Sequence, residues 1–157
     1  VENIPAALSA LMESDTVTGI STMYRTEPIG RPEQNPFVNG VWRIETDIEP
    51  RALKLNVLRG IEHRLGRVRT EDPYASRTID LDILLYGDLL IEEDGLVIPD
   101  PDILTRPFLA IPLVEIEPDL RLPGCGAALA LHPICGQTAG MVPLPDLTHK
   151  LKEMADL

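Results

Sequence analysis

Residues 74–85 read YASRTIDLDILL, a polar segment that passes into a strict alternation of apolar and acidic side chains. In an extended chain Leu81 and Ile83 fall on one side, and Asp80 and Asp82 fall on the other. A period of two in an apolar run predicts a strand with one face in a core, here over residues 78–86. Side chains two residues apart in a strand project from the same face, about 6.6 Å apart. The sequence therefore predicts two carboxylates side by side on one strand.

A carboxylate pair of this kind suits a hard cation. Mg²⁺ prefers one or two carboxylates together with waters and substrate phosphates, and Arg77 stands just before the strand, where it could meet an anion. A nucleotide-phosphate site is therefore one interpretation of Asp80 and Asp82. The other is that both residues line the solvated face of an ordinary half-buried strand. Asp is depleted in strands, which favours function, but an Asp-x-Asp pair alone does not decide between the two.

Length and charge limit the classes of protein that the chain can represent. With 157 residues the chain is long enough for one domain with a real core, so we expect residues 1–157 to form a single domain. No apolar run approaches the length of a membrane-spanning helix, which is about 18 residues or more. The net charge of −11 argues against non-specific binding of nucleic acid or of an anionic membrane surface. An acidic protein that handles phosphates must concentrate its arginines locally or recruit a metal ion.

The chain has two cysteines, Cys125 and Cys135, and no second pair that would complete a zinc site. A disulfide between them is one possibility. Two buried or unreactive thiols in a reducing cytosol are the favoured interpretation. We therefore expect a cytoplasmic protein.

Hydrophobic spacing predicts an α+β fold. Helices are expected over residues 4–13, 50–66, 107–115 and 146–155, and strands over 16–24, 37–47 and 78–86, with a short extension at 89–92. Loops rich in Pro, Gly or charge are expected at 25–36, 67–77 and 99–105. The order helix–strand–strand–helix–strand is that of a split βαβ unit without its first strand. We therefore expect a ferredoxin-like antiparallel sheet with helices packed on it, whose first strand lies before Val1.

Several blocks of sequence, taken together, resemble the 6-hydroxymethyl-7,8-dihydropterin pyrophosphokinase family of folate biosynthesis. The most specific block is SRTIDLDIL at residues 76–84. Other matching blocks occur in the order that the family has them: YRTEPIG at 24–30, FVN at 37–39, GRVR at 66–69, RPFL at 106–109 and PL at 112–113. The resemblance runs from about residue 3 to residue 120. It implies transfer of an intact diphosphate from ATP to the hydroxymethyl group of the pterin, with release of AMP.

The resemblance assigns the ATP side of the site. Asp80 and Asp82 would hold two Mg²⁺ ions against the ATP phosphates, so that catalysis consists mostly of positioning and charge neutralisation. Arg67 and Arg77 bracket the loop 67–77 and would close onto the triphosphate, and both count with the two aspartates as catalytic candidates. Arg106 would add a further contact. The alternative for each arginine is a solvated position in a loop.

Glu62 matches a nucleotide-contacting position of the family. On its own it reads as an ordinary exposed helix residue. Asp100 is also a candidate for ATP binding, although family members commonly carry a histidine there. A carboxylate would repel phosphate unless a metal ion or an arginine intervenes, so we expect lower nucleotide affinity. The three histidines do not take the missing role by position: His63, His132 and His149.

The resemblance also assigns the pterin side. Phe37 and Phe108, the only phenylalanines in the chain, match the positions that sandwich the pterin ring, a task that suits offset-stacking aromatics. Core packing is the alternative, above all for Phe108 at a helix start. Asn39 shares the outward face of its strand with Phe37 and would donate and accept hydrogen bonds at the pterin edge. Further pocket residues are implied by position: Thr26, Pro28 and Ile29 through their backbone, and Tyr74 as an aromatic lid.

Three functional readings follow. The first is an Mg²⁺-dependent diphosphokinase, monomeric or weakly homodimeric, whose partners are ATP and the pterin. The second is a catalytically impaired pterin- or nucleotide-binding homologue, to which only Asp100 and the absent first strand point. The third is one module of a larger folate-pathway assembly. Retention of Asp80 and Asp82 with Arg67 and Arg77 favours the enzyme, because a mere binding protein has little need for the whole set.

Overall fold

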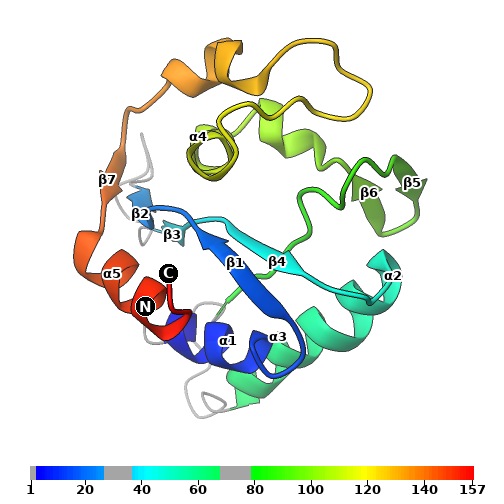
Figure 1. Ribbon diagram of the computed structural model, residues 1–157, viewed down its shortest axis with the longest axis vertical. Coiled ribbons are helices and arrows are strands. Elements are labelled where there is room, and N and C mark those ends of the chain that lie inside the picture. The colour runs from blue at the N-terminus through cyan, green and yellow to red at the C-terminus, as the bar shows by residue number, and fades with distance from the viewer. Residues whose placement is uncertain (1–2, 27–36, 68–78) are drawn as a thin grey trace. The chain divides into compact units, whose positions relative to one another are not determined.

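The computed structural model describes residues 3–26, 37–67 and 79–157 (Figure 1). Its chain forms two compact units. The first unit comprises Val1–Val17 and Ile44–Ile83, and the second comprises Thr18–Arg43 and Leu84–Leu157. Helices alternate with short strands that pair in antiparallel fashion, so the expected mixed α and β content is confirmed. No helix in the described part of the chain has both the length and the apolar composition that crossing a bilayer requires.

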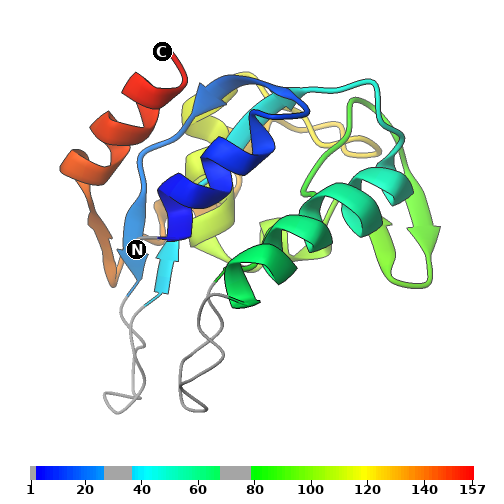
Figure 2. The same cartoon turned by 90° about the horizontal axis from the view of Figure 1, so that it is seen from below.

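Helices dominate the first unit. Helix α1 (Asn3–Leu11) lies against α3 (Arg59–Arg67), as Figure 2 shows. The predicted helix 4–13 is confirmed, although it ends two residues earlier. The predicted helix 50–66 is also confirmed and runs to Arg67. Its expected apolar stripe is buried or half-buried: Leu53, Val57, Leu58, Ile61 and Leu65.

The second helical segment changes its winding along its length. Short helix α2 (Pro50–Ala52) begins after Glu49, whose side chain accepts hydrogen bonds from two backbone N–H groups of the first turn. This is the usual way in which a helix start satisfies its unpaired donors. A π-helical stretch, η1 (Leu53–Leu58), then leads into α3, and the N–H of Arg59 donates to the carbonyl of Lys54, five residues earlier. Such a stretch holds one residue more than the same turn of α-helix.

The predicted strand 78–86 is wrong over its described part, residues 79–86, which form no strand. The expected period of two survives in exposure, since Asp80 and Asp82 are exposed while Leu81 and Ile83 are half-buried. A strand exists through ladder bonds to a neighbour. Here the N–H of Leu81 donates to the carboxylate of Glu62 at 2.7 Å, and none of the strands in the described residues pairs with this segment.

The two other predicted strands each divide in two. Residues 16–24 give β1 (Thr16–Ile20) and, after a break, β2 (Tyr24–Thr26), while residues 37–47 give β3 (Phe37–Asn39) and β4 (Trp42–Glu45). Strands β1 and β4 form a two-stranded sheet. Gly40 lies in the break before β4, and a Cβ there would lie 2.1 Å from Sδ of Met23. A larger residue at this position would therefore require the Met23 side chain to move.

A three-stranded antiparallel sheet of order β3–β2–β7 belongs to the second unit. Thr26 pairs with Phe37 of β3 on one side and with Met141 of β7 (Met141–Pro143) on the other. The sequence did not predict β7, because residues 121–145 carry no clear period. Helix α5 (Pro145–Met154) follows β7 and confirms the predicted helix 146–155 within one residue.

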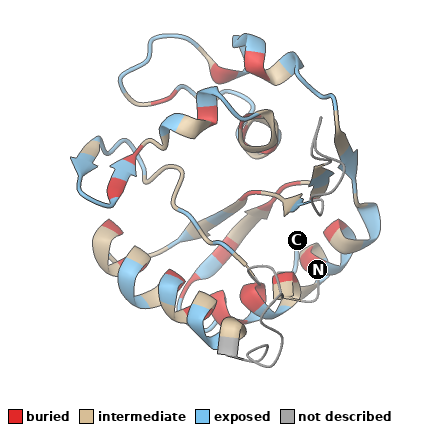
Figure 3. Cartoon of the chain, turned by 180° about the vertical axis from the view of Figure 1, so that it is seen from behind, coloured by how far each residue is buried: buried red, intermediate tan, exposed pale blue. Residues whose placement is uncertain are grey.

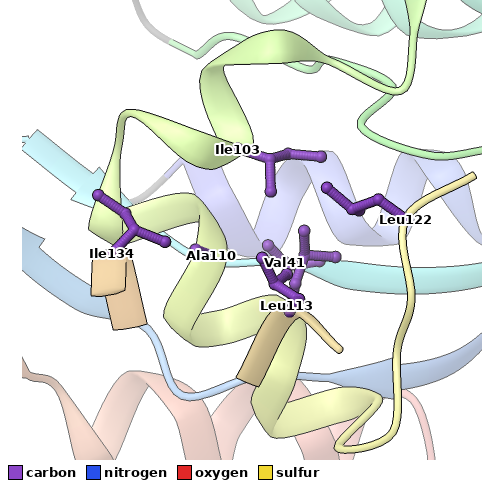
Figure 4. Close-up of a cluster of buried hydrophobic side chains, with 7 residues drawn as sticks. Val41, Ile103, Ala110, Leu113, Leu122 and Ile134 are labelled. Carbon is purple, nitrogen blue, oxygen red and sulfur yellow. The ribbon is translucent and has the colours of Figure 1, made fainter. Parts of the chain in front are cut away.

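Helix α4 (Pro107–Ile116) contributes to the core of the second unit and confirms the predicted helix 107–115. Its residues Ala110 and Leu113 pack with buried side chains from several short elements (Figure 4): Val41, Ile103, Leu122, Leu129 and Ile134. Three 3₁₀ turns supply most of these, namely η2 (Pro101–Leu104), η3 (Leu129–Leu131) and η4 (Pro133–Gly136). The expected loop 99–105 therefore contains a helical turn.

A β-hairpin extends the second unit. Strand β5 (Ile91–Glu93), close to the expected extension 89–92, pairs with β6 (Leu96–Ile98), which alternates buried and exposed positions (Figure 3). Gly95 adopts a φ of +77° in the turn between them, a conformation that glycine reaches without steric cost. The two cysteines are free; Cys125 is exposed and Cys135 is half-buried.

Candidate active site

The carboxylate pair lies in the first unit, on the segment without helix or strand that follows the undescribed residues 68–78. Asp80 and Asp82 are both exposed and alternate with half-buried apolar residues. Within the described ranges no group of three or more His, Cys, Asp or Glu side chains could hold a metal ion. Two carboxylates that gain no third ligand of these types from the described residues leave coordination positions for water and phosphate oxygens. This donor set fits Mg²⁺, which is usually held in that way at phosphate-transferring sites.

Glu62 projects from α3 toward the same segment. Its Oε2 accepts the hydrogen bond from the N–H of Leu81 at 2.7 Å, and the residue is half-buried. Its interpretation as an ordinary exposed helix residue is therefore wrong. Sequence analysis had no signal for this contact, because its partner is a backbone group that every residue except proline carries.

The predicted arginines of the phosphate side are described only in part. Arg67 is the last residue of α3. Arg77 lies outside the described residues, and so do three of the predicted pterin-side positions, Pro28, Ile29 and Tyr74.

In the second unit, the structure brings three of the predicted pterin-side residues together on neighbouring strands. Thr26 of β2 pairs with Phe37 of β3, and Nδ2 of Asn39 donates to Oγ1 of Thr26 at 3.5 Å. Phe37 is 63% exposed, so the alternative that it packs in the core is wrong. An exposed aromatic ring next to an amide is suited to hold a flat heterocycle with polar edges.

Arg106 and Phe108 lie together at the start of α4. The guanidinium of Arg106 lies 5.9 Å from the centroid of the Phe108 ring, and its Nη2 lies 3.6 Å from Oδ2 of Asp102. Phe108 is half-buried, whereas the Arg106 side chain keeps 54% exposure. A guanidinium held by an aromatic face and a carboxylate loses less freedom when it binds an anion.

Asp100 has a structural task that its sequence context did not predict. Its Oδ1 accepts the N–H of Asp102 at 2.9 Å and so caps the 3₁₀ turn η2, and its own N–H donates to the carbonyl of Leu84 at 2.9 Å. Asp is among the preferred residues for capping a helical turn. The acidic residue at this position therefore stabilises the turn that precedes Arg106.

Tyr24 pairs with Asn39 across β2 and β3 and is half-buried. Burial raises the pKa of its phenol above the ordinary value, and the negative charge of Glu115 adds to this, whereas a hydrogen bond with Thr22 acts in the opposite direction. The carboxylate of Glu115 is fixed by two hydrogen bonds from Thr22, at 2.8 Å from the N–H and 2.7 Å from the hydroxyl. Tyr24 therefore stays neutral near pH 7.

Comparison with known proteins identifies the family. The family model described as 7,8-dihydro-6-hydroxymethylpterin-pyrophosphokinase matches residues 1–118. The 2-amino-4-hydroxy-6-hydroxymethyldihydropteridine pyrophosphokinase of Haemophilus influenzae is 43% identical over 125 residues, which cover 78% of this chain and 77% of that protein. The enzyme of the same name from Pseudomonas aeruginosa is 40% identical over 124 residues, with 78% and 75% covered.

A relative within a larger protein also matches. The folic acid synthesis protein fol1 of Schizosaccharomyces pombe is 40% identical over 126 residues, which cover 78% of this chain but only 17% of that protein. The family match over residues 1–118 agrees with the span of about residues 3–120 that the sequence motifs indicate. The chain therefore belongs to the 7,8-dihydro-6-hydroxymethylpterin-pyrophosphokinase family.

Proposed function

We propose that this chain transfers diphosphate from ATP to 6-hydroxymethyl-7,8-dihydropterin in folate biosynthesis, as an ATP-dependent diphosphokinase. The hydroxyl oxygen of the pterin forms a bond to the β-phosphorus of ATP, the bond from that phosphorus to the oxygen bridging to the α-phosphate breaks, and AMP leaves. The hydroxyl proton is released. The observation that carries this proposal is the family match over residues 1–118, which includes every candidate site residue.

For the phosphate side, we assign metal binding to Asp80 and Asp82 and expect two Mg²⁺ ions with ATP. Bound Mg²⁺ would orient the phosphates and neutralise their charge. Support comes from the exposure of both carboxylates, which are separated by one residue. Arg67, Arg77 and Arg106 would bind the triphosphate, and the exposed guanidinium of Arg106 supports its part in this. Glu62 and Asp100 would lie at the edge of the nucleotide site.

On the pterin side we assign ring stacking to Phe37 and Phe108 and edge recognition to Asn39. The 63% exposure of Phe37 and the hydrogen bond between Asn39 and Thr26 support this assignment. The family motifs add Thr26, Pro28 and Ile29 as backbone contacts and Tyr74 as a lid.

We further propose that residues 1–157 act as one catalytic domain with a ferredoxin-like arrangement, because the family match includes parts of both compact units. Antiparallel strand pairs together with helices support that fold. We place the protein in the cytoplasm as a monomer or weak homodimer, and its two free thiols support a reducing compartment. The net charge of −11 supports small-molecule partners rather than nucleic acid or membrane.

The direct test is AMP release from ATP and Mg²⁺, measured with and without 6-hydroxymethyl-7,8-dihydropterin. We expect AMP that depends on the pterin, accompanied by the pterin diphosphate in equal amount. If the protein binds the pterin but releases no AMP, the chain is a catalytically impaired binding homologue and not an active enzyme. In that case Asp100→His would be the first variant to assay.

A further inference from the structure

We propose that Glu62 is a positioning residue that orients the Asp80–Asp82 pair through the backbone N–H of Leu81. This inference rests on the proposed function, since it takes the two aspartates as the carboxylates that receive the metal–nucleotide complex. It gives Glu62 a task other than direct contact with the nucleotide.

The contact is short, and its donor belongs to Leu81, the residue between the two aspartates. Oε2 of Glu62 accepts the Leu81 N–H at 2.7 Å, which is at the short end of the range for N–H···O bonds and typical of an ionised acceptor. Residues 79–83 pair with no strand in the described parts of the chain. The carboxylate thus takes the place that a carbonyl of a neighbouring strand would fill in a sheet.

Holding this one N–H constrains the direction of the preceding side chain. The peptide group is planar from Cα of Asp80 to Cα of Leu81. Fixing its N–H therefore limits rotation about the bond that joins Cα of Asp80 to its carbonyl carbon, and about the N–Cα bond of Leu81. Those two rotations are half of the four backbone rotations that set the direction of the Asp80 side chain relative to that of Asp82. One hydrogen bond thus restricts how far the two carboxylates can turn away from each other.

Glu62 is well placed to act as a fixed point. It lies on α3, which packs against α1, and the preceding residue, Ile61, is 4% exposed. A side chain on a packed helix is held more firmly than one on a loop. Because Oε2 is already engaged by the Leu81 N–H, the carboxylate acts on the pair through the backbone.

Three variants separate this role from others. Glu62→Ala removes the acceptor, and Glu62→Gln keeps an acceptor of the same length without the charge. His63→Ala changes the next residue of α3, which is exposed, and serves as the matched control. The probes are the amide signal of Leu81 in ¹H–¹⁵N NMR spectra of the metal-free protein, and the affinity for Mn²⁺ with the α,β-methylene analogue of ATP.

We expect Glu62→Ala to move the Leu81 amide proton upfield and to lower Mn²⁺ affinity by about 10- to 100-fold, the usual effect of removing a group that orients a metal ligand. Glu62→Gln should recover about half of that loss on a logarithmic scale, since a neutral hydrogen bond is about half as strong as a charged one. Pterin affinity, and both probes in His63→Ala, should stay unchanged.

An unchanged Leu81 signal or unchanged Mn²⁺ affinity in Glu62→Ala would overturn the inference. So would a Glu62→Gln variant that keeps the Leu81 signal but loses as much metal affinity as Glu62→Ala, because Glu62 would then bind the metal itself. A wild-type protein that shows the expected NMR and Mn²⁺ behaviour but no pterin-dependent AMP release would remove the proposed reaction and leave the positioning role intact.

Discussion

At the scale of single residues, a substitution of Asp82 separates an effect on catalysis from an effect on stability. Its side chain is exposed, so Asp82→Ala should change the free energy of unfolding by no more than about 0.5 kcal/mol. If the carboxylate holds the metal that the phosphates need, pterin-dependent AMP release should fall by about 100-fold or more. Steady-state AMP release and thermal unfolding measure the two effects. Asp88→Ala, at another exposed aspartate, is the control, and normal turnover of Asp82→Ala would refute the metal assignment.

The two thiols differ enough to be told apart by labelling. Burial raises the pKa of the Cys135 thiol, whose Sγ donates to the carbonyl of Leu129 at 3.3 Å, whereas Cys125 is exposed. Because the thiolate is the reactive form, iodoacetamide at pH 8 should modify Cys125 several-fold faster than Cys135. Peptide mass spectrometry over time gives the two rates. Equal rates in the folded protein would contradict the burial of Cys135.

The identity of the side chains predicted the exposure and roles of some of these residues better than those of others. The alternation around Asp80 and Asp82 predicted their exposure, because it depends only on which side chains prefer water. The spacing of Phe37 and Asn39 on one strand predicted their common face in the same way. The role of Glu62 could not be predicted, since a backbone N–H leaves no mark on the sequence. The capping role of Asp100 was likewise not predicted, because the sequence analysis considered this residue only as a replacement for the histidine that family members commonly carry.

At the scale of elements, Thr148 connects α5 to the chain between β1 and β2. Its hydroxyl donates to the carbonyl of Leu144 and accepts the N–H of Met23, both at 2.8 Å, and the residue is 8% exposed. Thr148→Val should therefore lower the free energy of unfolding by about 1–3 kcal/mol, because the N–H of Met23 is left buried without an acceptor. Urea unfolding provides the measurement.

Thr105 supplies the matched control for this prediction. Its hydroxyl also donates to a backbone carbonyl, that of Asp102 at 3.3 Å, but the residue is exposed. Thr105→Val should change the free energy of unfolding by less than about 0.5 kcal/mol. Equal effects of the two substitutions would show that the contact to Met23 contributes nothing of its own.

Helices were predicted more accurately than strands, for a physical reason. The hydrogen bonds of α1, α4 and α5 are local, so apolar spacing and flanking prolines suffice to place them within a few residues. A strand depends on a partner that is distant in sequence. Residues 78–86 have the sequence pattern of a strand, but their described part, residues 79–86, has no partner among the described strands. Conversely, β7 pairs with β2 although its own sequence carries no period of two.

At the scale of the whole molecule, the free energy of unfolding should depend on pH in the alkaline range, because Tyr24 ionises there. Its pKa is raised in the folded state, above an unfolded value of about 10. The folded chain therefore keeps this proton more tightly, and its contribution to stability is fully present below pH 10 and is lost as pH rises through the folded pKa. The free energy of unfolding should decline in this range, and less steeply in Tyr24→Phe.

Urea unfolding of both proteins from pH 8 to pH 11 provides the comparison. The difference between wild type and Tyr24→Phe should be constant up to about pH 10 and should change above it. Two curves that stay parallel over the whole range would mean that the environment of Tyr24, with Glu115 nearby, does not disfavour its ionised form.

The π-helical stretch η1 sets the rotational phase of everything that follows it on the same helix. Each residue of an α-helix advances the chain by about 100° around the axis. The π-helical winding accommodates one residue more than the same turn of α-helix. If Leu53–Leu58 kept all its residues but wound as regular α-helix, Glu62 would turn by about a quarter of a circle away from Leu81. A one-residue deletion in this stretch should therefore let it close into α-helix and keep the hydrogen bond between Glu62 and Leu81, whereas a one-residue deletion within α3 before Glu62 should mimic Glu62→Ala.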